Sequence, residues 1–227
     1  MKYTRNFILS ACDEAAQKDI RLFYTSDFIN YRGKTSDTNE FYTEVVAEWV
    51  LNNLDLIKAI PTNTRESGYK VDSHDGVIKN KHSNRKEEIT ALEMYQQSEI
   101  PGLGKLVDYQ TPLKNKSEDP VGKVDLLSFD GRVVRLLELK KSDSSETMLR
   151  CVLEGYTYLK TVNIPKLLES FSLPLDSMVV ANPLVHIDSL QHEEMSEDKP
   201  FLKKLIKELD CKPLYFYLKD KSYVVEE

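Results

Sequence analysis

The sequence predicts an α/β protein in which helices cover both faces of a mixed sheet. Two observations predict this fold class. In the runs on either side of Asp130-Gly131, apolar residues occupy both the odd and the even positions. Because side chains alternate between the two faces of a strand, this indicates strands buried on both faces. From residue 84 onward the patterns also alternate in the order helix, three strands, helix, strand, helix and one or two closing strands. A chain of 227 residues with 41% hydrophobic content can bury one sizeable core.

Residues 1–80 differ from this pattern, and we expect them to form a mainly helical accessory segment beside a core at 81–227. A helix, with or without a following strand, is expected in Phe7–Tyr24. Apolar residues at helical spacing predict a long helix over Thr38–Ile60. Residues 61–84 are polar and turn-rich, with a candidate hairpin at Asp75-Gly76. The segment could serve as a surface for a protein partner, as a homodimer interface or as a cap over a substrate.

In the core, Asn84 is a candidate N-cap for a helix over 85–98, with Glu87 and Glu88 in its first turn. Pro101-Gly102 ends that helix. The remaining expected elements are strands at 106–111, 177–185, 213–218 and 222–225, and helices at 146–161, capped by Ser144 or Ser145, and at 200–209.

The hairpin at the centre of the core gathers charged residues on one face. A two-residue turn at Asp130-Gly131 places Asp125 opposite Leu136, with Glu138 two residues further along. Because side chains alternate along a strand, Asp125, Glu138 and Lys140 project from the same side. Diagonal neighbours in a sheet lie roughly 7–8 Å apart, so two carboxylates there can close on one divalent cation with an ammonium group beside them.

A plainer interpretation is a salt bridge between Glu138 and Lys140 at the end of a buried strand. Adding Asp125 leaves net negative charge in apolar surroundings, and a divalent cation would relieve it. Oxygen ligands without histidine or cysteine favour Mg²⁺ or Mn²⁺ over Zn²⁺.

The segment Gly122-Lys123-Val124-Asp125, followed by the hairpin and by Glu138-Leu139-Lys140, resembles the PD-(D/E)xK nuclease superfamily. The order of elements from 84 to 218 is similar to the core of that superfamily, a three-layer α/β/α restriction-endonuclease-like fold with a central mixed sheet. Val124 stands where a proline sometimes precedes the aspartate.

This resemblance implies a metal-dependent nuclease that hydrolyses phosphodiester bonds of nucleic acid, with DNA as the expected substrate. Asp125 and Glu138 would bind Mg²⁺ or Mn²⁺ together with the backbone carbonyl of Leu139. Lys140 would orient or help to deprotonate the attacking water.

Many members of the superfamily carry a further acid on the helix before the strands. We expect Glu88 to be this acid, as a metal ligand or a residue that supports one, in preference to Glu87 and Glu93. It shares a helical face with Ala91, Leu92 and Tyr95, the side expected to face the core. The alternative is a first-turn acid that interacts only with the helix dipole.

The helix after the lysine carries a further polar pattern. Glu154 and Tyr158 resemble the QxxxY motif of exonuclease-like members, with glutamate in place of glutamine. Arg150 lies one turn earlier, so the three form one stripe. We interpret the stripe either as a wall of the site, with Arg150 on a phosphate, or as a solvent-facing salt bridge beside a packed tyrosine.

The formal charge of −6 argues against a protein that binds nucleic acid through a basic surface overall. Local basic groups could still serve a substrate, at Lys79, Lys81, Arg85 and Lys86 or at Lys114, Lys116 and Lys123. Two other functions therefore stay open: a catalytically inactive nuclease-fold module that binds nucleic acid or protein, and an unrelated α/β protein with a chance salt bridge.

The sequence contains no run of the roughly 20 apolar residues that a membrane span needs, and its first residues make a poor secretion signal. Three widely spaced cysteines favour a reduced, cytoplasmic protein.

Overall fold

The computed structural model describes residues 2–77, 85–115 and 122–227. Within these residues the fold is α/β, as predicted, with seven strands in one mixed sheet that follows the chain order β1 to β7. The β4–β5 and β5–β6 pairs are parallel and the other neighbours are antiparallel. The strands are β1 (Glu99–Ile100), β2 (Gly104–Pro112), β3 (Lys123–Phe129), β4 (Val133–Lys140), β5 (Met178–His186), β6 (Leu214–Lys219) and β7 (Ser222–Glu226).

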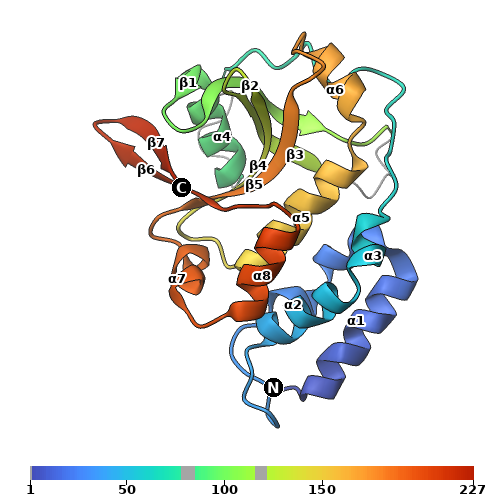
Figure 1. Cartoon of the computed structure of the whole chain (residues 1–227). Helices are drawn as coiled ribbons and strands as arrows, with labels where there is room; N and C mark the ends of the chain where they lie inside the picture. The colour runs from blue at the N-terminus through green and yellow to red at the C-terminus, as the bar shows by residue number, and fades with distance from the viewer. Residues whose placement is uncertain (1, 78–84, 116–121) are drawn as a thin grey trace.

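Helices lie on both sides of this sheet, with α4 on one face and α5 on the other (Figure 1). The helices are α1 (Arg5–Asp19), α2 (Tyr42–Asn52), α3 (Leu54–Lys58), α4 (Lys86–Gln96), α5 (Met148–Thr161), α6 (Ile164–Ser170), α7 (Leu190–Ser196) and α8 (Pro200–Glu208), with two 3₁₀ helices, η1 (Ile20–Thr25) and η2 (Asp27–Asn30). Among the described residues, every helix is too short or too polar to span a bilayer.

The N-terminal helices share a hydrophobic core with the α5 side of the sheet. Ile8 and Trp49 belong to the same buried cluster as Leu127 and Leu136. A buried carboxylate strengthens this connection, because Glu44 of α2 accepts the first free N–H groups of α8, from Phe201 and Leu202 at 2.9 and 2.8 Å. Residues 2–60 therefore pack directly onto the helices that cover the sheet.

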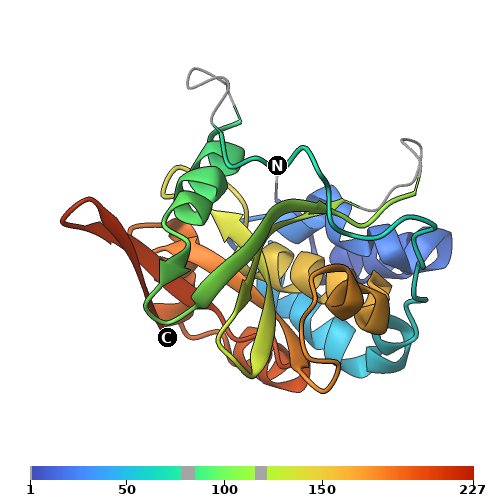
Figure 2. The ribbon, with the colours of Figure 1, turned by 90° about the horizontal axis from the view of Figure 1, so that it is seen from above.

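The sheet curls until its first and last strands meet on the α4 side. The N–H of Val225 in β7 donates to the carbonyl of Pro101, just after β1, at 3.3 Å. Gly102 permits this approach, since its φ is +89° and a Cβ there would lie 2.5 Å from the Val225 carbonyl oxygen. Figure 2 shows α4 beside this part of the sheet, and Ala91 and Met94 of α4 belong to the buried cluster on that side.

Several expected elements differ from the structure. The helix expected over Thr38–Ile60 begins at Tyr42 and is interrupted at Asn53, whose side chain instead donates to the Trp49 carbonyl at 2.8 Å. The region Phe7–Tyr24 contains helical turns without a strand. Asp75-Gly76 is not flanked by strands in the described part of the chain.

The first turn of α5 also starts later than expected. Thr147 is its N-cap, accepting the N–H of Arg150 at 3.2 Å, so neither Ser144 nor Ser145 caps the helix. Three short elements, β1, α6 and α7, were not expected. The candidate cap Asn84 and the basic residues Lys79, Lys81 and Lys116 lie outside the described residues.

Candidate functional site

The β3–β4 hairpin pairs two residues away from the predicted register, with Phe129 opposite Val134. The loop is Gly131-Arg132 rather than Asp130-Gly131. The reason lies in the Asp130 side chain, which accepts the N–H groups of Arg132 and Val133 at 3.0 and 2.8 Å and so holds the turn one residue later. Gly131, with φ of +98°, takes the first loop position.

A shift of two residues keeps every side chain on its predicted face. The observed register, continued by one residue beyond Leu126 and Leu137, sets Asp125 opposite Glu138 instead of Leu136. The structure thus brings Asp125, Glu138 and Lys140 together on the α5 face of the sheet, in a closer arrangement than the diagonal one expected.

Asp125 is held by two hydrogen bonds. Its Oδ1 accepts the Gln110 side-chain amide at 2.8 Å, and its Oδ2 accepts the Leu139 N–H at 2.9 Å. Gln110 lies on β2 with φ of +49°. No signal in the sequence identified it, because its approach depends on the irregular pairing of β2 with β3.

Lys140 is buried and surrounded by carboxylates. Its Nζ lies 2.6 Å from Glu138 Oε1, 2.9 Å from Glu146 Oε2 and 3.8 Å from Glu154 Oε2. Burial lowers the pKa of Lys140, but these acids outweigh that effect and hold the pKa well above its ordinary value. The ammonium group is therefore charged.

Burial, and then repulsion from neighbouring acids, raises the pKa values of Asp125 and Glu138. Burial raises the pKa of Asp125 to about 6, although Lys140 and the Leu139 N–H oppose the shift. Burial and then Asp125 raise the pKa of Glu138 well above its ordinary value. Glu154 Oε2 is buried without a hydrogen bond among the described residues. Excess negative charge of this kind is what a bound cation would relieve.

The most buried side of α4 is rotated from the expected face, with which it shares Ala91. Thr90, Ala91 and Met94 are the buried residues of α4, and Glu87 lies on this face, one turn before them. Burial raises the pKa of Glu87, with Lys140 lowering it and Glu146 raising it, so Glu87 acts electrostatically on the same cluster.

Glu88, the acid expected as a ligand, follows Glu87 in the sequence and therefore points to a different side of α4. It pairs with Arg85 at 3.1 Å, and its side chain is 37% exposed. Both Glu87 and Glu88 line a cavity of about 520 Å³ that Asp125 also lines. The other lining residues are Arg85, Lys86, Gln110, Lys141, Asp143 and Ser144.

The polar stripe on α5 is buried beside Lys140 rather than solvent-facing. Tyr158 Oη donates to Glu154 Oε1 at 2.8 Å, and both residues are buried. Arg150 Nε lies 2.8 Å from Glu146 Oε1, and Arg150 Nη1 donates to the Tyr24 carbonyl at 3.3 Å. Glu146 thus links Lys140 to Arg150. Glu146 lies in the loop before α5, although the sequence predicts it as the first residue of the helix, and no pattern in the sequence indicates this role.

Lys123 is exposed at the first position of β3, two residues before Asp125. Among the described residues, no three histidine, cysteine, aspartate or glutamate side chains converge as a ready-made metal site. Comparisons with protein-family models, curated proteins and solved structures find no match to this chain.

Proposed function

We propose that this protein is a metal-dependent nuclease with a three-layer α/β/α core of the restriction-endonuclease-like type, and that it hydrolyses phosphodiester bonds of DNA. The observation that carries the proposal is the meeting of Asp125, Glu138 and Lys140 on one sheet face, where Asp125 also lines a cavity of about 520 Å³. The resemblance of their spacing to the PD-(D/E)xK motif supports it.

The charges at the site fit a divalent cation. Asp125 and Glu138 face each other with raised pKa values, and the buried oxygen of Glu154 has no hydrogen-bond donor in the described structure. Mg²⁺ or Mn²⁺ would be held by Asp125, Glu138 and the Leu139 carbonyl, with Glu87 or Glu88 contributing from α4. When bound, the ion supplies a more acidic water and stabilises charge that develops on the phosphate.

Lys140 would orient the attacking water and offset charge on the phosphate, as its charged state allows. Glu138 and Glu146 fix the position of its ammonium group at 2.6 and 2.9 Å. An ammonium group fixed in this way requires little reorganisation during the reaction.

The cavity wall suits a phosphodiester. Arg85, Lys86 and Lys141 contribute basic groups beside the acids. Lys123 and Arg150 are the further residues that we assign to substrate binding. Arg150 would have to exchange its bond to Glu146 for one to phosphate.

Cleavage of labelled DNA in Mg²⁺ or Mn²⁺ tests the proposal. Asp125→Ala and Lys140→Ala should each abolish cleavage, while circular dichroism shows a retained fold. Cleavage by both variants at the wild-type rate would overturn the assignment.

A second candidate is a nuclease-fold module that binds nucleic acid or protein without catalysis. It is favoured by the tight pairing of Lys140 with Glu138 and by the two hydrogen bonds already made by Asp125. Titration with Mn²⁺ separates the candidates. Thermal stabilisation that disappears in Asp125→Ala supports the nuclease, and a protein indifferent to Mn²⁺ supports the module.

The proposal also covers the cellular location of the protein and its protein partners. Cys12, Cys151 and Cys211 are buried free thiols, in keeping with a reduced, cytoplasmic environment. Exposed Phe7 and Leu56 mark the N-terminal segment as the place for a protein partner or a second copy.

A further inference from the structure

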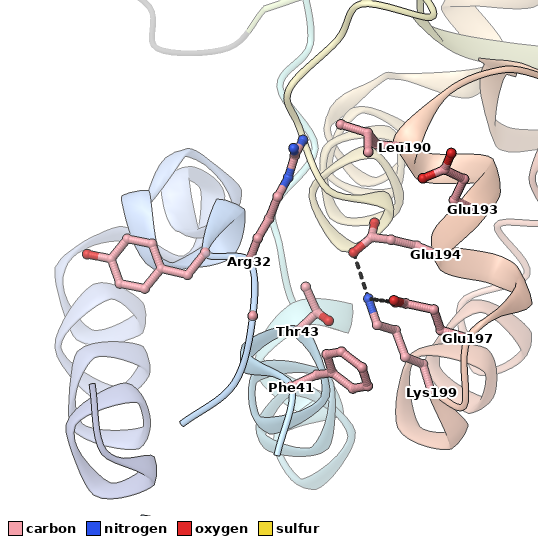
Figure 3. A pocket seen from close by; sticks show the side chains of 10 residues that line it. Arg32, Phe41, Thr43, Leu190, Glu193, Glu194, Glu197 and Lys199 are labelled. Atoms are coloured by element: carbon pink, nitrogen blue, oxygen red, sulfur yellow. Dashed lines mark hydrogen bonds and ion pairs between the residues drawn. The ribbon is translucent and has the colours of Figure 1, made fainter. Parts of the chain in front are cut away.

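A second cavity lies between the N-terminal segment and α7, outside the candidate active site. Its volume is about 140 Å³, and Figure 3 shows the side chains that line it. Arg32, Phe41 and Thr43 form one wall, while Glu193, Glu194 and Lys199 contribute to the other.

The charges of this second cavity sum to a net negative value. Lys199 is buried and already paired, with Nζ 2.8 Å from Glu194 and 2.8 Å from Glu197. Arg32 Nη2 donates to the Ser145 carbonyl, and in Figure 3 its guanidinium group points away from Phe41. The exposed side chain of Glu193 has neither a hydrogen bond nor an ion pair among the described residues, so no neighbouring cation balances its negative charge.

An unpartnered polar atom also lines this cavity. Thr43 is only 3% exposed, and its Oγ1 has no hydrogen-bond partner in the described residues. A buried hydroxyl left without a partner costs free energy. A ligand with a donor group would satisfy Thr43 Oγ1 and, if positively charged, would also balance Glu193.

Two residues of the second cavity form hydrogen bonds with the segment that leads into α5. The Met148 N–H donates to Glu194 Oε2 at 2.6 Å, and Arg32 holds the Ser145 carbonyl from the other wall. Between these two points lies Glu146, whose carboxylate is 2.9 Å from Lys140. A ligand in the cavity would contact Arg32 and Glu194, the two side chains that hold this segment in place.

We propose that the second cavity binds a small organic ammonium ion, and that its occupancy is transmitted to residues 145–148. The volume equals that of roughly four to five water molecules, which excludes a nucleotide and admits an amine of a few heavy atoms. Binding stands independently of the nuclease proposal. Its regulatory consequence, through Glu146 and Lys140, rests on that proposal.

An NMR titration of the full chain with ethanolamine at pH 7 tests both parts, with ethylene glycol and glycolate as neutral and anionic controls of similar size. We expect saturable shifts of the Thr43, Glu193 and Met148 amide signals that extend to Glu146. The two controls should leave these signals in place. This readout needs neither metal nor cleavage, so it succeeds or fails separately from the proposed nuclease activity.

Two variants sharpen the test. Glu193→Gln removes the unbalanced charge from an exposed position and should weaken binding by up to about fivefold. Thr43→Val keeps the shape of the side chain, and it should weaken binding about fivefold while leaving the free protein as stable or more stable. Absence of saturable shifts, equal binding of glycolate, or full affinity in both variants would overturn the proposal. Shifts at Thr43 that stop short of residues 145–148 would overturn its second part.

Discussion

The carboxylate of Asp125 accepts the N–H of Leu139 at 2.9 Å, and Leu139 is the residue between Glu138 and Lys140. Asp125 is thereby fixed to the strand that carries both of its charged neighbours. The same bond keeps the half-buried carboxylate of Asp125 opposite the buried carboxylate of Glu138, and burial raises the pKa of each. The site is therefore held together at a cost in stability, as functional sites often are.

Replacing Asp125 by asparagine should stabilise the metal-free protein at pH 7.5 by about 1–2 kcal/mol. The rise of the Asp125 pKa from 3.8 to about 6 sets a ceiling of about 3 kcal/mol. The gain is smaller than the ceiling because the asparagine amide donates at one of the two places where the carboxylate accepts. Urea denaturation measures the change, and a loss of stability in Asp125→Asn would contradict it.

The raised pKa of Asp125 also predicts that the free energy of unfolding depends on pH. Between pH 3.8 and about 6 the folded protein binds more protons at Asp125 than the unfolded chain does. The contribution of Asp125 to the free energy of unfolding therefore falls as pH rises through this range, and stays low above it. Unfolding measured at pH 5 and pH 7.5 should show a smaller decline in Asp125→Asn than in the wild type. An equal decline would assign the effect to other groups.

The contributions of Lys140 and Glu138 to the stability of the fold should be strongly coupled. Lys140→Met leaves Glu138 buried without its 2.6 Å partner, and we expect a loss of about 3–5 kcal/mol at pH 7.5. The loss should shrink at pH 5, where Glu138 can take up a proton because its pKa is already raised. Adding Glu138→Gln should recover most of the stability. A double-mutant cycle by urea denaturation measures the coupling, and additive single effects would contradict it.

Glu87 and Glu88 offer a matched pair on α4. Glu87 acts on the buried cluster, whereas Glu88 pairs with Arg85 near the surface. Glu87→Gln should lower the affinity for Mn²⁺ by about tenfold or more, and Glu88→Gln by less than about threefold. Calorimetric titration of both variants measures the difference. A larger loss in Glu88→Gln would instead support Glu88, the acid predicted from the sequence.

The common face of Asp125, Glu138 and Lys140 could be predicted because alternation along a strand is a local property. It holds even though the register differs by two residues from the expected one. The register itself depended on the Asp130 side chain, which selects between two adjacent loops that the sequence does not distinguish.

The partners of these residues could not be predicted, because tertiary packing selects them. Which acid of α4 faces the site depends on how the helix is rotated, and the apolar pattern around Leu92 and Tyr95 suggested a different rotation. Gln110 and Glu146 come from an irregular strand and a loop, where periodicity carries no information about direction.

Closure of the sheet at Gly102 predicts a specific sensitivity to substitution. Gly33 and Gly102 have almost the same φ, +87° and +89°, but a Cβ at Gly33 meets nothing within 4 Å, while one at Gly102 meets the Val225 carbonyl oxygen at 2.5 Å. Gly33→Ala should cost only the strain of a left-handed conformation, about 1–2 kcal/mol. Gly102→Ala should cost a further 1–3 kcal/mol, roughly, because the β1 and β7 ends must separate. Denaturant unfolding of the two variants measures both losses of stability. Amide exchange at Val225 shows whether its hydrogen bond to the Pro101 carbonyl is kept. Equal losses in the two variants would mean that the strands at the two edges do not meet.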